Sequence, residues 1–301
     1  MREVTSGQRN QQQSAAGYKR GLGNRLRARS TAAATIVIGN GLRLSFAERG
    51  DESGPTLLLL PGPTDSWPSY EPVLSRLPSS IHVIALSLRG HGDSDKPAFG
   101  YQVEDFAADV VAFLDAVSIG SAVLAGHSGS CLVARRVAID WPERVAGLVL
   151  EASPTTLKGD AQLEAFVQST VLNLVDPIGH AFARRFVVDT STDLIGEEIV
   201  ERLVEELLKV PTRVWKETMS GLMRYDDLDE LDLILAPTLL IWGDSDPLVG
   251  LEMQKDLVRA IPNATLSRYP GIGHTPRWED PTRFAKEVGA FVRRSNQRES
   301  A

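Results

Sequence analysis

The chain has 301 residues, of which 43% are hydrophobic and 24% are charged, and its formal net charge is −7. These proportions are ordinary for a globular protein, so they exclude collagen-like repeats and disorder along the whole chain. The single cysteine, Cys131, excludes an intrachain disulfide, and no run of 18 apolar residues is present to predict a membrane-spanning helix.

The first 35 residues differ in composition from the rest of the chain. They hold seven basic residues and one acid, a net charge of +6, which leaves −13 for the remainder. Because this segment is also poor in large apolar residues, we expect residues 1–34 to be a disordered basic extension, either dispensable or a targeting or nucleic-acid arm. The acidic remainder would repel phosphates, so we expect no nucleic-acid partner for the body of the protein. No secretory signal pattern is visible, which favours a cytoplasmic location.

Beyond this extension, short apolar runs alternate with amphipathic segments of helical length. Several runs are apolar throughout, which is typical of strands covered on both faces. The eight predicted strands are Thr35–Ile38, Arg43–Glu48, Thr56–Leu60, Ile81–Leu88, Ala122–Ala125, Val145–Glu151, Thr238–Trp242 and Ala264–Tyr269. The predicted helices among them are Glu104–Val117, Ser130–Ile139, Leu251–Ile261 and Arg283–Arg293. This order predicts an α/β core of residues 35–153 and 233–297, with a doubly wound, mostly parallel, eight-stranded sheet.

Residues 154–232 interrupt the alternation, because they show helical periodicity and almost no strand signal. The helices predicted here are Asp160–Leu174, Ile178–Val187, Ile195–Lys209 and Thr212–Met223. A helical segment inserted between two strands is expected to form a lid over the carboxyl edge of the sheet, where open α/β sheets bind ligands. The alternative is a helical subdomain that has no contact with a ligand.

A candidate nucleophile follows the strand at Ala122–Ala125. The run Gly126-His-Ser-Gly-Ser130 lies between that strand and a predicted helix, so Ser128 falls on a sharp turn at a helix N-terminus. There the N–H of Gly129 can donate to an oxyanion. The alternative is an ordinary Gly/Ser turn, which the presence of partner residues elsewhere in the chain disfavours.

A nucleophilic serine needs a base, and the chain has five histidines. His274 is favoured because it lies in a Gly-rich loop directly after the last predicted strand, at the same sheet edge as Ser128. A carboxylate must then orient the imidazole. Asp246, in the loop after the preceding strand, is the favoured acid, and Asp244 and Glu151 are the alternatives.

The order Ser128, Asp246, His274, with a helical insertion before the acid, resembles the α/β-hydrolase fold in its lid-bearing group of esterases, lactonases, perhydrolases and C–C hydrolases. The resemblance covers roughly residues 36–295. Its segments are Leu57-Leu-Leu-Leu-Pro-Gly62, Leu88-Arg-Gly-His-Gly-Asp-Ser94, Gly126-His-Ser-Gly-Ser130, Trp242-Gly-Asp-Ser-Asp246 and Gly273-His-Thr-Pro276. Epoxide hydrolases and haloalkane dehalogenases of this fold place aspartate at the elbow, so Ser128 argues against both.

One departure from the family pattern concerns the second oxyanion donor. Family members read His-Gly-x in this loop, and the residue after the glycine donates its backbone N–H. This chain reads Pro61-Gly62-Pro63-Thr64, so Pro63 stands at the donor position and has no N–H. Losing one such donor typically lowers turnover by about 100- to 1,000-fold. We expect that Thr64 supplies its amide or hydroxyl instead, or that the oxyanion hole rests mainly on Gly129.

The remaining candidates concern the lining of the site. Trp67, His127 and Trp242 flank the expected site and are candidates for its lining, with core packing as the alternative. Cys131 is expected to be a buried packing residue. No metal-ligand spacing or dinucleotide fingerprint is visible, so we expect neither a metal nor a cofactor.

The resemblance and these residues together predict a cofactor-independent serine hydrolase. Its expected substrate is a small or medium carboxylic ester or lactone, cleaved through a Ser-His-Asp triad and an acyl-enzyme by a monomer or homodimer. The alternatives are a C–C bond hydrolase or perhydrolase with the same triad, or a ligand-binding protein with low turnover.

Overall fold

The computed structural model describes residues 31–192 and 195–299, so residues 1–30 of the predicted basic extension lie outside the described part of the chain. One sheet has the strand order β1-β2-β4-β3-β5-β6-β7-β8. The strands are β1 (Ala32–Val37), β2 (Arg43–Arg49), β3 (Thr56–Leu60), β4 (His82–Leu86), β5 (Ala122–His127), β6 (Val145–Glu151), β7 (Thr238–Gly243) and β8 (Ala264–Tyr269). Strand β2 is antiparallel to both neighbours, and the other pairs are parallel. The predicted α/β class and mostly parallel eight-stranded sheet are confirmed, although the first strand begins at Ala32, before the predicted Thr35.

The central strands are apolar throughout because both of their faces are covered. In β3, Leu58 and Leu60 belong to the hydrophobic cluster on one face, whereas Leu57 and Leu59 belong to the cluster on the other. All four side chains are fully buried. Since successive side chains of a strand point to opposite faces, continuous hydrophobicity is what a doubly covered strand requires.

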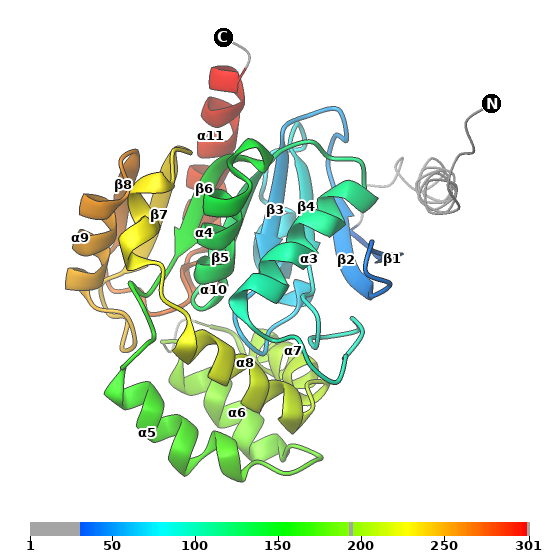
Figure 1. Cartoon of the computed structure of the whole chain (residues 1–301), viewed down its shortest axis with the longest axis vertical. Helices are drawn as coiled ribbons and strands as arrows, with labels where there is room; N and C mark the ends of the chain where they lie inside the picture. Colours follow the sequence, from blue (N-terminus) through cyan, green and yellow to red (C-terminus); the bar gives the residue numbers. More distant parts are fainter. Residues whose placement is uncertain (1–30, 193–194, 300–301) are drawn as a thin grey trace.

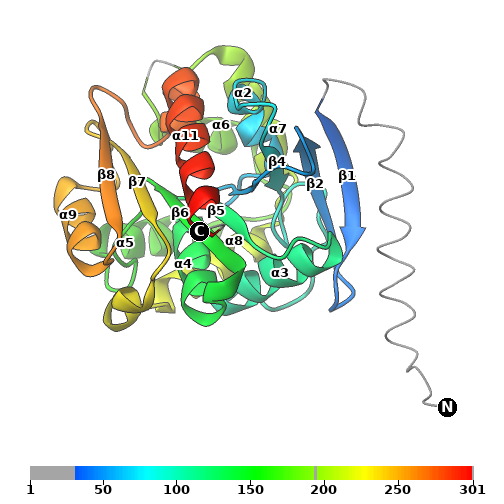
Figure 2. The same ribbon diagram turned by 90° about the horizontal axis from the view of Figure 1, so that it is seen from above.

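Helices on the two faces of the sheet form the outer layers (Figures 1 and 2). Helices α3 (Val103–Ala116), α4 (Ser130–Asp140) and α9 (Leu251–Ala260) contribute buried residues to one cluster. Helices α2 (Glu71–Leu74) and α11 (Pro281–Glu299) contribute to the other. The start of α3 is stabilised by the Asp105 carboxylate, which accepts the N–H of Gln102 at 3.0 Å in a capping-box arrangement.

Four helices lie between β6 and β7, and we call them the helical insertion: α5 (Ala161–Ser169), α6 (His180–Asp189), α7 (Glu197–Leu208) and α8 (Thr212–Arg224). Figure 1 shows them together at one end of the sheet. The first is shorter than the predicted Asp160–Leu174, because Thr170 leaves helical geometry at a φ of −123° and the short 3-10 turn η3 (Val171–Asn173) follows. The insertion is tied to the core by polar contacts, including a hydrogen bond of 2.6 Å from Ser66 Oγ to Glu206 Oε2.

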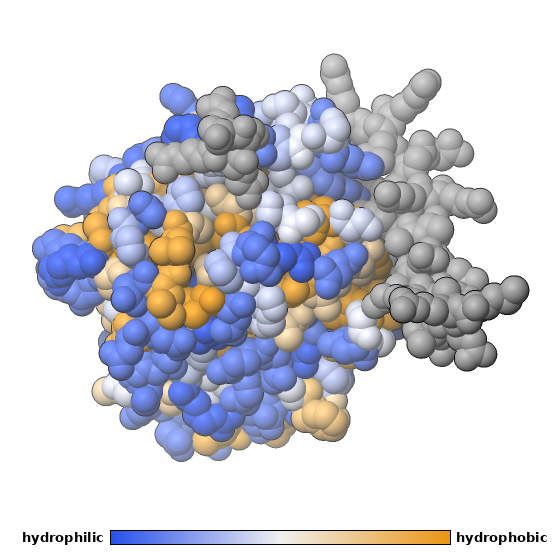
Figure 3. Space-filling view, turned by 45° about the horizontal axis from the view of Figure 1, so that its top comes forward, coloured by the Kyte–Doolittle hydropathy of each residue, from blue (hydrophilic) through white to orange (hydrophobic). Residues whose placement is uncertain are grey.

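The face in Figure 3 is mostly hydrophilic, with hydrophobic residues in separate patches. Exposed large hydrophobic side chains such as Phe99 and Leu235 come from different segments. Within residues 31–192 and 195–299, no helix has the length and hydropathy needed to cross a membrane.

Candidate active site

Ser128 lies on the turn between β5 and α4. Its φ of 52° is in the left-handed region, which non-glycine residues adopt only under constraint. Two backbone hydrogen bonds of 2.9 Å hold the turn: Ser128 N–H donates to the Glu151 carbonyl, and Cys131 N–H donates to the Ser128 carbonyl. A Cβ at Gly126 would lie 2.6 Å from the Ser130 carbonyl oxygen, so only glycine lets strand and helix approach this closely. The turn therefore puts Ser128 just beyond the carboxyl end of β5.

His274 and Asp246 come from the loops after β8 and β7 and meet at this edge. The Nδ1 atom of His274 lies 2.8 Å from Asp246 Oδ2. Asp246 Oδ1 accepts the backbone N–H groups of Leu248 at 2.8 Å and Val249 at 3.0 Å. These bonds fix the carboxylate, and an ionised carboxylate makes Nδ1 the protonated nitrogen of His274. The Nε2 atom is thereby left as an acceptor.

The two alternative acids are engaged elsewhere. Asp244 accepts the Gly271 N–H at 2.6 Å and pairs with Arg268 at 2.8 Å. Glu151 accepts the backbone N–H of Arg277 at 2.8 Å and faces its guanidinium at 3.3 Å. Neither carboxylate contacts the His274 ring among the described residues, whereas Asp246 does.

Ser128 and His274 line one cavity of about 700 Å³. Among the described residues, no hydrogen bond joins Ser128 Oγ to His274. Such contacts are often longer than a hydrogen bond before substrate is bound, so this geometry is compatible with a nucleophile–base pair. The cavity also brings Gly129 and Pro63 alongside Ser128.

The loop after β3 forms a tight turn over the N-terminus of α4. Asp65 N–H donates to the Gly62 carbonyl at 3.1 Å, and Thr64 has a φ of 74°. Proline at the second position and a positive φ at the third define a type II turn, in which glycine rather than threonine is usual. Pro63 packs against the elbow, since a Cβ at Gly129 would lie 2.8 Å from Pro63 Cγ.

Thr64 itself is buried, and its Oγ1 has no hydrogen-bond partner among the described residues. No acceptor is found in the described part of the chain for the backbone N–H of Thr64 or of Gly129. Gly62, Pro63 and Asp65 line the cavity, whereas the atoms of Thr64 do not form part of its wall. The turn therefore holds an unused N–H group at Thr64, next to the cavity wall.

The histidine before the nucleophile is a neutral packing partner of the base. His127 Nε2 lies 3.1 Å from the carbonyl oxygen of His274, and the two rings are 4.9 Å apart. Burial, with a smaller contribution from the Arg277 guanidinium, holds the pKa of His127 well below its usual value. A Cβ at Gly62 would lie 2.6 Å from His127 Nδ1, so this imidazole packs directly against the loop after β3.

The cavity walls come from both the core loops and the helical insertion. Its apolar lining includes Leu157, Leu163, Phe166, Phe182, Phe186, Met219, Leu222, Leu248, Met253 and Trp278. Of the three predicted lining candidates, His127 contributes to the wall, whereas Trp67 and Trp242 lie outside it. Trp242 is buried and donates its Nε1–H to the Val249 carbonyl at 2.7 Å, beneath the Asp246 loop.

Cys131 is fully buried in α4, and burial raises the pKa of its thiol to about 12. It is therefore protonated at neutral pH and unsuited to nucleophilic attack. Across the described ranges, no group of three or more His, Cys, Asp or Glu side chains is arranged to hold a metal ion.

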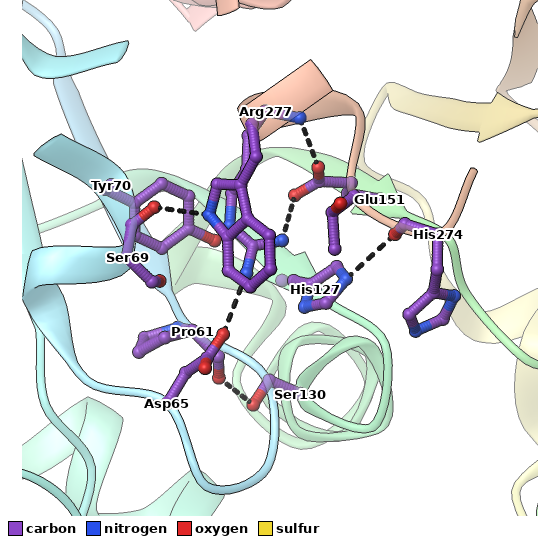
Figure 4. Close-up of polar contacts among 12 residues, drawn as sticks. Pro61, Asp65, Ser69, Tyr70, His127, Ser130, Glu151, His274 and Arg277 are labelled. Carbon is purple, nitrogen blue, oxygen red and sulfur yellow. Dashed lines mark hydrogen bonds and ion pairs between the residues drawn. The ribbon is translucent and has the colours of Figure 1, made fainter. Parts of the chain in front are cut away.

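Sequence reasoning missed a buried ionic cluster beside the site. Arg277, three residues after His274, contacts both Glu151 and Asp65 (Figure 4). The sequence identifies Glu151 only as an alternative acid and indicates no role for Asp65 or Arg277. The one signal in the sequence is a charged residue directly after Gly-His-Thr-Pro. The sequence does not show which carboxylates, distant along the chain, folding brings into contact with it.

Comparisons with known proteins concern the family and the fold of the chain. The family model described as "alpha/beta hydrolase fold" matches residues 55–281. The chain is 27% identical over 254 residues to 3-oxoadipate enol-lactonase 2 of Acinetobacter baylyi, covering 84% of this chain and 94% of that protein. It is 29% identical over 274 residues to 2-hydroxy-6-oxononadienedioate/2-hydroxy-6-oxononatrienedioate hydrolase of Burkholderia vietnamiensis, covering 85% and 93%. Among solved structures, a thermophilic esterase from Thermogutta terrifontis is similar in fold, with a TM-score of 0.78, 22% identity and coverage of 88% and 99%.

Proposed function

The chain belongs to the α/β-hydrolase fold family, and we propose that it is a cofactor-independent serine hydrolase of small or medium carboxylic esters or lactones. The observation that carries this proposal is the 2.8 Å contact between His274 Nδ1 and Asp246 Oδ2 in a cavity that Ser128 also lines. Because a fold of this kind hosts many activities, the proposal rests on these three side chains and on the cavity around them.

In the proposed mechanism, Ser128 Oγ attacks the carbonyl carbon of the substrate. His274 Nε2 takes the hydroxyl proton and then passes it to the leaving alkoxide, while Asp246 stabilises the imidazolium and keeps Nδ1 protonated. Water, deprotonated by the same nitrogen, then attacks the acyl-enzyme and releases the acid. As the second tetrahedral intermediate collapses, that proton passes to the departing Ser128 Oγ, so the serine hydroxyl is restored and the net reaction consumes one water.

The oxyanion of each tetrahedral intermediate needs donors that are already in place. We assign the first to the N–H of Gly129, next to the nucleophile at the N-terminus of α4, and the second to the N–H of Thr64. The type II turn supports this assignment, because it leaves the Thr64 N–H without an acceptor among the described residues while Pro63 has no N–H to offer. The strained φ of 74° at Thr64 is then the conformation that presents this group.

The helical insertion is proposed to act as a lid over this site. Its residues Leu163, Phe166, Phe182 and Leu222 supply part of the apolar wall of the cavity that Ser128 also lines. An apolar cavity of about 700 Å³ is large enough to bury a small or medium acyl group. This lining supports an ester or lactone with an apolar portion as substrate.

One observation favours a second candidate function. Pro63 removes the usual backbone donor, so a reaction that depends less on that donor, such as C–C bond hydrolysis or peracid formation, would suffer less from its absence. The same triad could serve both reactions. Activity on 1,3-diketones, or on acetate with hydrogen peroxide, exceeding that on every ester would favour this candidate.

The test is a panel of p-nitrophenyl esters with acyl chains from C2 to C12, assayed with the wild type and Ser128→Ala. We expect hydrolysis by the wild type that Ser128→Ala abolishes while leaving the circular dichroism spectrum and melting temperature intact. The optimum acyl length would measure the depth of the cavity. Undiminished hydrolysis by folded Ser128→Ala would overturn the proposal.

A further inference from the structure

Arg277 is a fully buried arginine that contacts carboxylates from two separate segments of the site. Its Nη2 lies 2.8 Å from Asp65 Oδ2, and its Nη1 lies 3.3 Å from Glu151 Oε2. Its backbone N–H also donates to Glu151 Oε1 at 2.8 Å. Figure 4 shows the guanidinium between the two carboxylates, with His127 and His274 to one side.

Each partner of Arg277 belongs to a segment with a proposed role in catalysis. Asp65 closes the turn that holds Thr64, the proposed oxyanion donor. Glu151 is the last residue of β6, and its carbonyl accepts the N–H of Ser128. Arg277 itself follows His274 by three residues, at the start of α10 (Pro276–Glu279). The guanidinium therefore joins the turn that carries the proposed oxyanion donor to the strand end that hydrogen-bonds the Ser128 backbone, and Arg277 itself lies on the segment of the base.

Aromatic residues fix the guanidinium in its plane. Its central carbon lies 4.4 Å from the centroid of the Trp278 ring and 5.3 Å from that of Tyr70. Both rings are anchored in turn, because Trp278 Nε1–H donates to the Ser69 carbonyl at 2.7 Å and Tyr70 Oη–H donates to the Leu60 carbonyl at 3.1 Å. Arginine stacked and hydrogen-bonded in this way has little freedom to move.

The cluster is not arranged for greatest stability. Two carboxylates share one cation, so the ionised cluster carries excess negative charge, with Arg277 and Glu151 buried and Asp65 at the cavity wall. Burial raises the pKa of Asp65 to about 6, against the opposing effect of Arg277. Burial likewise raises the pKa of Glu151. Buried ion clusters of this kind often contribute less stability than apolar residues of the same size would, so a role in geometry is the better explanation for this one.

We propose that Arg277 is a positioning residue that, through Asp65 and Glu151, holds the turn at residues 62–65 at a fixed place relative to Ser128 and His274. The role in catalysis rests on the proposed function, since it concerns the placement of the Thr64 donor. The turn needs such an anchor because its strained Thr64 and its proline would otherwise relax. A displacement of about 1 Å in an oxyanion donor is enough to lower turnover by about 100-fold.

We call Arg277 with its partners Asp65 and Glu151 the clamp, and two substitutions weaken it with little change in side-chain size. Asp65→Asn removes one carboxylate and leaves Arg277 paired with Glu151, and Arg277→Lys keeps the positive charge but loses the planar fork that bridges two carboxylates. We expect each to lower kcat for a p-nitrophenyl ester by about 10- to 100-fold, with KM within about threefold of the wild type. Because both act on one clamp, the double variant should be little worse than the poorer single variant.

The matched control is the buried pair Arg89–Asp109, joined by two hydrogen bonds of 2.5 and 2.6 Å, neither member of which lines the cavity. Arg89→Lys and Asp109→Asn should lower the melting temperature and leave kcat within about twofold. An equal loss of kcat in these controls would assign the effect to general destabilisation and overturn the proposal. Unchanged kcat in Asp65→Asn and Arg277→Lys would overturn it as well.

Amide hydrogen exchange tests the role of the clamp independently of the proposed activity. Amides in residues 61–67 should exchange faster in Asp65→Asn and Arg277→Lys than in the wild type, with no such change in Arg89→Lys. If the wild type cleaved no ester, the proposed function would fail, and the exchange measurement would still decide on the clamp. Unchanged exchange at residues 61–67 would refute the clamp whatever the activity.

Discussion

The substitution Asp246→Asn probes the orientation of the base with almost no change in shape. In the wild type, Asp246 Oδ1 accepts two backbone N–H groups, from Leu248 and Val249, and Oδ2 faces His274 Nδ1 at 2.8 Å. An asparagine must keep its oxygen toward the two N–H groups, because its NH₂ would meet donors there. Its NH₂ then takes the place of Oδ2 and faces Nδ1.

An NH₂ group facing Nδ1 requires that nitrogen to be an acceptor, which moves the imidazole proton to Nε2. His274 in that tautomer cannot accept the proton of Ser128. The loss of such an aspartate in a Ser-His-Asp triad lowers kcat by about 10⁴-fold, or about 5.5 kcal/mol of transition-state stabilisation. Since both backbone hydrogen bonds survive, we expect the melting temperature to change little.

The assay is the kcat of purified Asp246→Asn on p-nitrophenyl butyrate at pH 7, with Asp244→Asn as the matched control. Asp244 is in the same loop and also accepts a backbone N–H, but its other partner is Arg268 rather than a histidine. We expect the control to retain kcat within a few-fold. A loss of less than tenfold in Asp246→Asn, or an equal loss in Asp244→Asn, would refute this account of how His274 is oriented.

Three other outcomes are expected. Burial raises the pKa of Asp65 from 3.8 to about 6 in the folded protein, so the folded state binds an extra proton between these values. The free energy of unfolding of the wild type, minus that of Asp65→Asn, should therefore rise by about 1 kcal/mol from pH 7 to pH 5 in urea titrations, and a fall would contradict this assignment. Ser66→Ala removes the donor to buried Glu206 and should lower the free energy of unfolding by about 1–3 kcal/mol; a change below 0.5 kcal/mol would show that the contact contributes little. The native protein should not react with iodoacetamide at pH 8, because burial raises the pKa of Cys131 to about 12, whereas rapid modification of this residue would show that it is accessible.

The sheet was predictable because strands that are covered on both faces have continuous runs of apolar residues. The run Leu57–Leu60 is apolar at every position, and it makes up all of β3 (Thr56–Leu60) except its first residue. The end of a helix is harder to predict, as the early end of α5 at Ser169 shows. The pattern of apolar residues continues beyond Thr170, although the backbone leaves helical geometry at that residue.

The candidate catalytic residues were accessible from sequence because each one directly follows a predicted strand. Parallel strands bring their carboxyl ends to one edge, so Ser128, Asp246 and His274 could be grouped without coordinates. Arg277 and Asp65 could not be grouped in this way, since they lie 212 residues apart and only the packing of α10 against the turn at residues 62–65 brings them together. Trp67 and Trp242 are close in sequence to site residues but do not line the cavity, because the direction of a side chain depends on packing that the sequence does not display.

The central claim is that Ser128 is activated by His274, and fluorophosphonate labelling located by mass spectrometry tests it most directly. The account predicts a single adduct on Ser128 in the wild type, no adduct in Ser128→Ala, and labelling slowed by at least about 100-fold in folded His274→Ala. An adduct on another residue, or labelling of Ser128 at the wild-type rate in His274→Ala, would contradict the account.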